Sequence, residues 1–174
     1  MHSRVVLIAL LAFAATTARA DGPDLGRPAT PDEIARWDIS IGPDGRGLPP
    51  GSGTARQGAA IYAQHCAACH GADATGKPND ALVGGQGTLV APQVALKTVG
   101  SYWPYATTLF DYVRRAMPLP APHSLSDAEV YAVVAYLLQR NGVIGETDVV
   151  DARSLPTIKM PNRDSFVPRY STHP

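Results

Sequence analysis

Cys66-Ala67-Ala68-Cys69-His70 is the stretch of sequence that decides the fold of this chain. The pattern C-x-x-C-H is typical of covalent attachment of a c-type haem. On a helical turn, Cys66 and Cys69 lie three residues apart on one face, where both thiols can form thioethers with the vinyl groups of one porphyrin. His70 follows at once, so its imidazole can bind the iron from the proximal side. The motif therefore predicts one haem c, held by Cys66 and Cys69, with His70 as an axial ligand.

Two cysteines and a histidine also occur in zinc half-sites and in thiol redox pairs. A structural zinc site needs about four ligands, but the chain contains only two cysteines and no second cluster of Cys and His. A thioredoxin-like redox pair is expected within a βαβ context, and the sequence shows no such pattern. Both alternatives are therefore disfavoured.

The first 20 residues have the three parts of a secretory signal peptide. His2 and Arg4 give a short polar, basic start, and an apolar run follows from Val5 to Ala15. Ala18-Arg19-Ala20 then forms a small-x-small cleavage site. The apolar run is short for a membrane span. We therefore expect a periplasmic protein, cleaved after Ala20, that keeps no membrane anchor once the signal peptide is removed.

Composition limits the partners and the size of the core. Removal of 20 of the 174 residues leaves 154, which fits one domain. The 15 basic and 15 acidic residues cancel, which argues against nucleic acid or an anionic membrane surface as a partner. With 16 glycines and 16 prolines, much of the chain must be loop or extended segment, so a buried haem would supply much of the apolar contact.

Capping motifs and apolar periodicity predict helices and no strands. Three sites have the form of a capping box, in which two side chains satisfy free N–H groups at a helix start. A further helix is predicted over 104–116, where apolar side chains share one face until Pro118 prevents continuation. The three capping boxes begin at Thr30, Thr54 and Ser126. The predicted fold class is therefore all-α.

These elements suggest four segments: a signal peptide over 1–20, an N-terminal extension over 21–53, a cytochrome c domain over 54–142 and an extended C-terminal tail over 143–174. The tail is rich in proline and has no period, so we expect it to add no layer to the domain. Its apolar and charged side chains favour a docking segment that orders on a partner protein. The alternative is a terminus that is solvated or wraps around its own domain.

The iron needs a second axial ligand or keeps an open site. Met117 follows a predicted helix that Pro118 ends, which leaves its side chain free to point inward. A thioether ligand raises the redox potential relative to a second histidine. We predict His70 and Met117 as the axial ligands, with His123 and Met160 as alternatives.

Other residues are candidates for the surroundings of the haem. Tyr102, Trp103 and Arg115 are candidate haem contacts because their polar ends suit the propionates; packing at the surface or rim is an equal alternative. A backbone carbonyl within 78–82 is expected to accept the second ring N–H of His70.

The predicted helix before the motif carries Gly58, which lets a crossing helix approach closely. Tyr62 and Tyr136 could meet at that crossing, where we expect both to be core residues without a redox role.

Several short patterns follow one another in a fixed order around the motif. A Gly-x-x-x-Tyr pair precedes it, Met-Pro follows it, and Leu-Ser-Asp opens a last helix that contains Tyr-Leu. They are Gly58 with Tyr62, Met117 with Pro118, Leu125 to Asp127, and Tyr136 with Leu137. In these residues the chain resembles a class I cytochrome c. The resemblance implies three to five helices around one covalent haem, with extended N- and C-terminal segments. One departure is that the family's usual Pro-x-Leu, whose proline carbonyl bonds the histidine, reads Asp80-Ala81-Leu82 here.

Three longer stretches are more specific: Ile39 to Gly53, Val99 to Pro118 and Lys159 to Asp164. They resemble the cytochrome c subunits of periplasmic sulfite dehydrogenases and, equally, of the sulfane dehydrogenase of the sulfur-oxidising system. In that family a molybdenum-pterin subunit oxidises the sulfur substrate, and the cytochrome accepts the electrons one at a time.

The resemblance implies an electron-transfer subunit that is not itself an enzyme and, with one motif, carries one haem. Its partners would be the molybdenum-pterin catalytic subunit and a downstream acceptor, such as a small cytochrome c or a terminal oxidase. The alternatives are a free periplasmic electron shuttle or the cytochrome subunit of another dehydrogenase. A haem peroxidase or gas sensor would need an open sixth position, against which Met117 argues.

Overall fold

The computed structural model describes residues 25–90, 92 and 94–167 of the chain. The chain divides into two compact units, one ending at Asp38 and the other beginning at Ile39. The predicted signal peptide over 1–20 lies outside the described residues. Among the helices that the structure describes, none is long and apolar enough to cross a membrane.

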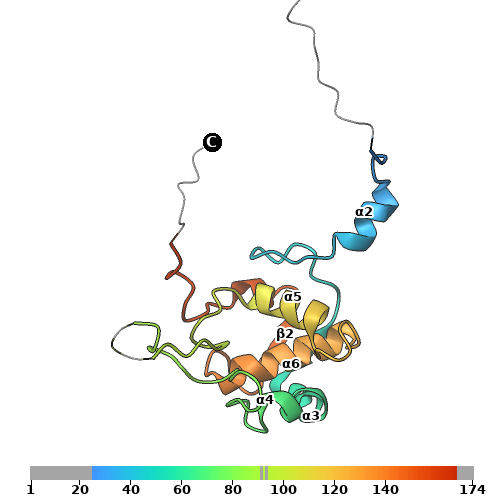
Figure 1. The fold of residues 1–174 in the computed structure, drawn as a ribbon. Helices are drawn as coiled ribbons and strands as arrows, with labels where there is room; N and C mark the ends of the chain where they lie inside the picture. The colour runs from blue at the N-terminus through green and yellow to red at the C-terminus, as the bar shows by residue number, and fades with distance from the viewer. Residues whose placement is uncertain (1–24, 91, 93, 168–174) are drawn as a thin grey trace, which may run out of the picture. The chain divides into compact units, whose positions relative to one another are not determined.

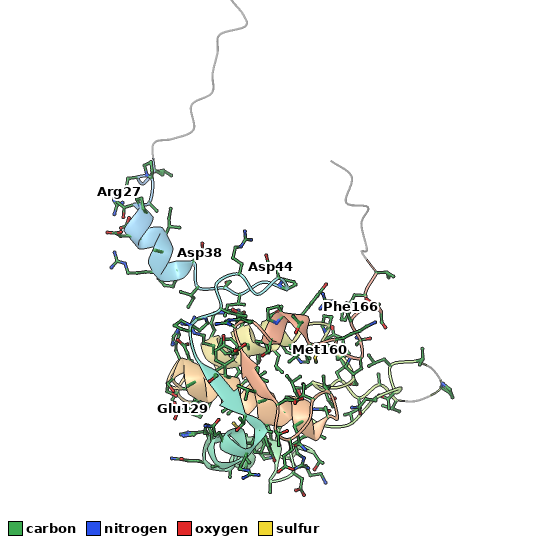
Figure 2. The ribbon with its side chains drawn as sticks, turned by 180° about the vertical axis from the view of Figure 1, so that it is seen from behind. Arg27, Asp38, Asp44, Glu129, Met160 and Phe166 are labelled. Carbon is green, nitrogen blue, oxygen red and sulfur yellow. The ribbon has the colours of Figure 1, made fainter. Side chains whose placement is uncertain are left out.

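The N-terminal unit contains one short helix, α2 (Pro31–Trp37), between the labelled residues Arg27 and Asp38 (Figure 2). The predicted capping box is present, since the Thr30 hydroxyl accepts from the Glu33 N–H and the Glu33 carboxylate accepts from the Thr30 N–H at 2.8 Å. Arg27 donates to the same carboxylate at 2.8 Å. The hydrogen bonds from Arg27 and Thr30 lower the pKa of Glu33 to about 2. The ionised cap stabilises a helix that is too short to persist through its backbone alone.

Within the described residues the second unit is mostly helical, and α6 lies between α3 and α5 (Figure 1). Its elements in chain order are β1 (Ser52–Thr54), α3 (Ala55–His65), α4 (Ala67–His70), α5 (Ala106–Ala116), α6 (Asp127–Arg140), β2 (Val149–Asp151) and the 3₁₀ turn η2 (Leu155–Thr157). This architecture confirms the predicted all-α class. The two three-residue strands were not predicted.

Glycine allows α3 and α6 to cross in close contact. A Cβ atom on Gly58 would overlap the main chain of Ala132, 2.5 Å from its carbonyl carbon, and one on Gly53 would lie 2.5 Å from the Ala132 Cα. Beside the crossing, the rings of Tyr62 and Tyr136 lie 5.1 Å apart between centroids. The predicted close approach at Gly58 and the meeting of the two tyrosines are both confirmed.

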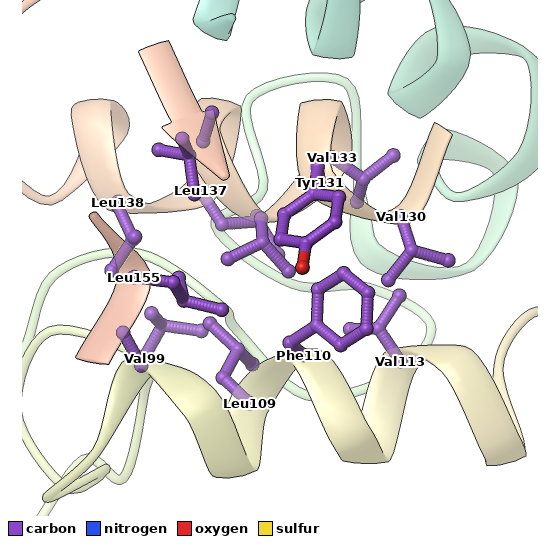
Figure 3. Close-up of a cluster of buried hydrophobic side chains, with 14 of the residues drawn as sticks. Val99, Leu109, Phe110, Val113, Val130, Tyr131, Val133, Leu137, Leu138 and Leu155 are labelled. Atoms are coloured by element: carbon purple, nitrogen blue, oxygen red, sulfur yellow. The ribbon is translucent and has the colours of Figure 1, made fainter. Parts of the chain in front are cut away.

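The main core lies between α5 and α6 (Figure 3). At its centre the rings of Phe110 and Tyr131 lie 4.4 Å apart between centroids. The Tyr131 hydroxyl donates to the Pro49 carbonyl at 2.9 Å, so its polar end is satisfied while burial raises its pKa to about 12. Further buried apolar side chains of the two helices are Leu109, Val113, Val130, Val133, Val134, Leu137 and Leu138.

The segment before α3 is also fixed to this core. The Ile41 N–H donates to the buried carboxylate of Asp111 on α5 at 2.9 Å, and the Ile41 side chain is itself buried. Arg115 pairs with the same carboxylate. Asp111 therefore joins the N-terminal flank to α5 with its charge compensated, as a buried carboxylate requires.

The C-terminal tail packs into the core as well. Strand β2 pairs antiparallel with β1, which places Val150 opposite Gly53. Val150, Leu155 and Met160 are each no more than 1% exposed. The expectation that the tail adds no layer to the domain is therefore wrong for residues 149–160. They enter the core because β2 pairs with the distant strand β1. Such pairing does not require a repeating pattern of apolar residues within the tail.

Because Met160 is fully buried, we expect Met160→Ala to lower the free energy of unfolding by about 2–5 kcal/mol through lost contacts and a residual cavity. The neighbouring Lys159 side chain is exposed, so Lys159→Ala should change it by less than about 0.5 kcal/mol. Urea unfolding followed by circular dichroism measures both. Equal stability of the two variants would show that Met160 does not support the core.

Candidate haem site

The C-x-x-C-H motif lies at a break between two helices. α3 ends at Cys66, whose backbone (φ −121°, ψ −36°) departs from helical geometry, and α4 begins at the next residue. The Cys66 carbonyl accepts from the N–H groups of Cys69 at 3.1 Å and His70 at 2.9 Å. The motif therefore forms one tight turn, with both cysteines half-buried. Burial, and secondarily Cys69, raise the pKa of the free Cys66 thiol to about 11.

A hydrogen bond orients the imidazole of His70. Its Nδ1 lies 2.8 Å from the Asp80 carbonyl oxygen. Because a carbonyl can only accept, Nδ1 must carry the proton, and Nε2 keeps its lone pair for a metal. The acceptor lies within 78–82, as predicted. Asp80 holds the place of the proline in the class I pattern, and its main chain supplies the same carbonyl.

The loop that follows the motif stabilises the turn of the motif through main-chain hydrogen bonds. The Asn79 N–H donates to the Cys69 carbonyl at 2.8 Å, and the Gly76 N–H donates to the His70 carbonyl at 2.9 Å. Gly71 has φ +81°, and a Cβ there would lie 2.7 Å from the Gly76 oxygen. Tyr62 adds a bond from α3, since its hydroxyl donates to the Gly71 carbonyl at 2.8 Å.

Asn141, just past the end of α6, fixes the next part of the loop. Its side-chain amide donates to the Leu82 carbonyl at 3.0 Å, and its side-chain oxygen accepts from the Gly84 N–H at 3.1 Å. The sequence predicts Asn141 only as the end of a helix. Its hydrogen bonds to the loop could not be predicted, because the partners are more than 50 residues away.

Met117 stands at the other candidate ligand position. It caps the C-terminus of α5 with extended backbone (φ −120°, ψ 148°), so the chain leaves the helix there. Its half-buried side chain packs against the core, as do those of Cys66, Leu82 and Trp103. The described residues therefore include two thiols and an oriented imidazole on one turn, and a half-buried thioether at the end of α5. This set of donors fits a covalently attached haem.

Comparison with known proteins supports a covalently attached haem c. Residues 53–137 match the model of the family described as cytochrome c oxidase, cbb3-type, subunit III. Among solved structures, the sulfane dehydrogenase SoxCD from Paracoccus pantotrophus matches with 42% identity over 84% of this chain and 72% of that chain, at a TM-score of 0.77. The chain belongs to the family of c-type cytochrome subunits of sulfane dehydrogenases.

This cytochrome carries covalently bound haem c and is an electron-transfer subunit rather than a catalyst. A bound haem c accepts and donates single electrons. A second solved structure, thiosulfate dehydrogenase (TsdBA) from Marichromatium purpuratum in its as-isolated form, matches with 25% identity over 76% of this chain and 25% of that one, at a TM-score of 0.34. That score is too low to relate the folds. Comparison with curated protein sequences gives no significant match.

The other candidate residues of the cytochrome lie in distinct environments. Trp103 is half-buried, with its ring 5.6 Å from that of Tyr112. Tyr102 is more exposed and lies beneath the Lys97 ammonium, 5.1 Å from the ring centroid. Arg115 donates through its Nε and one terminal nitrogen to the two carboxylate oxygens of Asp111.

The two alternative axial ligands differ from Met117 in burial. His123 is exposed, on a loop residue with φ +64°. Met160 is buried in the core. Met117 is the one of the three that is partly buried against the core.

Proposed function

We propose that this cytochrome accepts electrons from a molybdenum-pterin dehydrogenase subunit that oxidises sulfite or a protein-bound sulfane sulfur. The observation that carries the proposal is the 42% identity with the sulfane dehydrogenase SoxCD over most of both chains. The two cysteines and the oriented imidazole of the motif support it, because they suit one covalently attached haem, which accepts and donates single electrons.

His70 and Met117 are the proposed axial ligands, with Cys66 and Cys69 as the points of attachment. The Asp80 carbonyl keeps the His70 ring in one orientation and one tautomer. Met117 follows the last residue of α5. Its N–H makes a final helical hydrogen bond to the Val113 carbonyl at 3.1 Å, and the chain then leaves the helix. A thioether ligand favours the reduced iron, which suits an acceptor of electrons.

We expect Met117→Ala to remove the weak near-red charge-transfer band that marks methionine ligation in the oxidised protein. The redox potential should fall, because the thioether disfavours the oxidised iron and this effect is absent in the variant. Absorption spectroscopy and a redox titration measure these effects. Met160→Ala and His123→Ala should keep the band; loss of the band in either of them would assign the ligand elsewhere.

The proposed location is the periplasm, after cleavage of a signal peptide behind Ala20, with no membrane anchor in the mature protein. The proposed downstream acceptor is a small cytochrome c or a terminal oxidase. Mass spectrometry of the exported protein tests the cleavage site, since an N-terminus at Asp21 is expected.

Co-expression with the molybdenum-pterin subunit of the same organism tests the function. The two chains should co-purify, and addition of sulfite or a persulfide-bearing carrier protein should reduce the haem within the complex. The substrate that reduces it distinguishes a sulfite from a sulfane dehydrogenase. Failure to co-purify, with reduction only by diffusing donors, would favour a free shuttle. Carbon monoxide binding by the reduced protein would favour a haem enzyme or sensor.

A further inference from the structure

Two segments that are far apart in the sequence meet on the surface of the second unit. The Asn162 side-chain amide donates to the Tyr102 carbonyl at 2.8 Å. The Arg163 guanidinium lies over the Tyr105 ring, 4.3 Å from its centroid, and the Tyr102 and Phe166 rings meet edge to face at 5.4 Å. We name Lys97, Tyr102, Tyr105, Arg163 and Phe166 the aromatic-basic patch.

The backbone beneath the patch is fixed. On one side, buried Met160 and Asn162 hold the tail against the core. On the other, the Thr98 N–H donates to the buried Ser101 hydroxyl oxygen at 2.9 Å. Phe166 stands beyond Met160 towards the end of the described tail (Figure 2). A surface that is already ordered loses little conformational entropy when it binds a partner.

The chemistry of the patch is that of a protein interface. Aromatic and arginine side chains are enriched in the residues that dominate binding energy. Phe166 is 50% exposed, and the patch has two cations, Lys97 and Arg163, each stacked on a tyrosine ring. In the described part of the chain, neither cation lies within ion-pair distance of a carboxylate. A partner that presents carboxylates would complement both.

The patch borders the start of α5, because its member Tyr105 is the N-cap residue of that helix. Trp103 follows Tyr102 in the chain, and its ring lies against that of Tyr112 on α5. Tyr112 precedes Met117 by five residues, or about 7.5 Å along a helix axis. A protein bound to the patch would therefore lie beside the start of α5, and Met117 follows the other end of this 11-residue helix.

We propose that the aromatic-basic patch is the docking surface for the molybdenum-pterin subunit, which contacts Tyr102 and Phe166 with apolar side chains and Lys97 and Arg163 with carboxylates. This inference rests on the proposed function. It revises the expectation of a docking tail: Leu155 and Met160 point inward and support the domain, whereas Arg163 and Phe166 remain outside and bind the partner.

Binding of purified holo-cytochrome to the purified molybdenum-pterin subunit tests the proposal. Arg163→Glu should weaken binding about tenfold at low ionic strength, and the loss should shrink in about 1 M salt, where the screening length is about 3 Å. Phe166→Ser should weaken binding about tenfold at both ionic strengths. Arg56→Glu is the matched control, because this exposed arginine lies on α3, across α6 from α5; it should bind as the wild type does.

Haem absorption and the thermal midpoint confirm that each variant is folded. Wild-type affinity in both Arg163→Glu and Phe166→Ser would overturn the patch, as would an equal loss in Arg56→Glu. A dimer of the cytochrome alone in gel filtration that Phe166→Ser abolishes would assign the patch to a second copy of this chain. Wild-type protein that neither binds the subunit nor receives its electrons would instead overturn the proposed function.

Discussion

Cells that express Cys66→Ser together with Cys69→Ser should export a protein with no covalently bound haem. The structure gives the reason: the two half-buried cysteines of one turn are the only thiols in the chain, so no other attachment is possible. The measurement is a haem stain after denaturing gel electrophoresis, which removes any haem that is held without a covalent bond. A stained band from the double variant would contradict the assignment.

His123→Ala is the control for this experiment. His123 is exposed and distant in sequence from the motif, so the variant should keep both the stain and the wild-type absorption spectrum. The double cysteine variant should also unfold at a lower temperature, because a cofactor that is bound by the folded state stabilises it and is lost in the variant.

Gly58→Ala should lower the free energy of unfolding by about 3 kcal/mol or more, at the upper end of overpacking costs. The added methyl group would overlap the Ala132 main chain, which belongs to α6 and cannot turn aside as a flexible side chain can. For a domain of this size the thermal midpoint should fall by roughly 10 °C or more. Circular dichroism during heating of the holo-protein measures it.

Gly145→Ala provides the comparison. Gly145 is exposed, and its nearest neighbour for a new methyl group is the exposed Asp148 carboxylate at 3.3 Å. That side chain can move at little cost, so the midpoint should change by no more than a few degrees. Similar effects at both glycines would argue that the helix crossing tolerates a larger residue.

The parts of the fold that depend on local chemistry were predictable from the sequence. The three capping boxes mark the starts of α2, α3 and α6, because the capping residues bond within four positions of one another. The helix expected over 104–116 begins at Ala106, since Tyr105 is still extended. The C-x-x-C-H motif predicted the thiols and the imidazole for the same reason: its chemistry lies within five consecutive residues.

The parts that depend on distant contacts were not predictable in this way. The tail gave no sign that Val150, Leu155 and Met160 are buried, because their burial follows from pairing with β1 and not from a repeat. Asp80 accepts the His70 hydrogen bond through its main-chain carbonyl, a group that every residue has. Its side chain therefore gave no signal, and only its position two residues before Leu82 indicated its role. The aromatic-basic patch likewise depends on a distant contact, the hydrogen bond between the Asn162 side chain and the Tyr102 carbonyl, whose residues are 60 positions apart.

The short sheet makes the haem motif dependent on a segment of the chain that is synthesised after it. Ser52 pairs with Asp151, and α3, which presents the first cysteine, follows β1 without a break. A nonsense mutation or a proteolytic nick before residue 149 would therefore loosen the motif while leaving every haem-binding residue intact. The strand that completes β1 is synthesised after the whole stretch from Cys66 to Met117. The sheet can close only after both cysteines have left the ribosome.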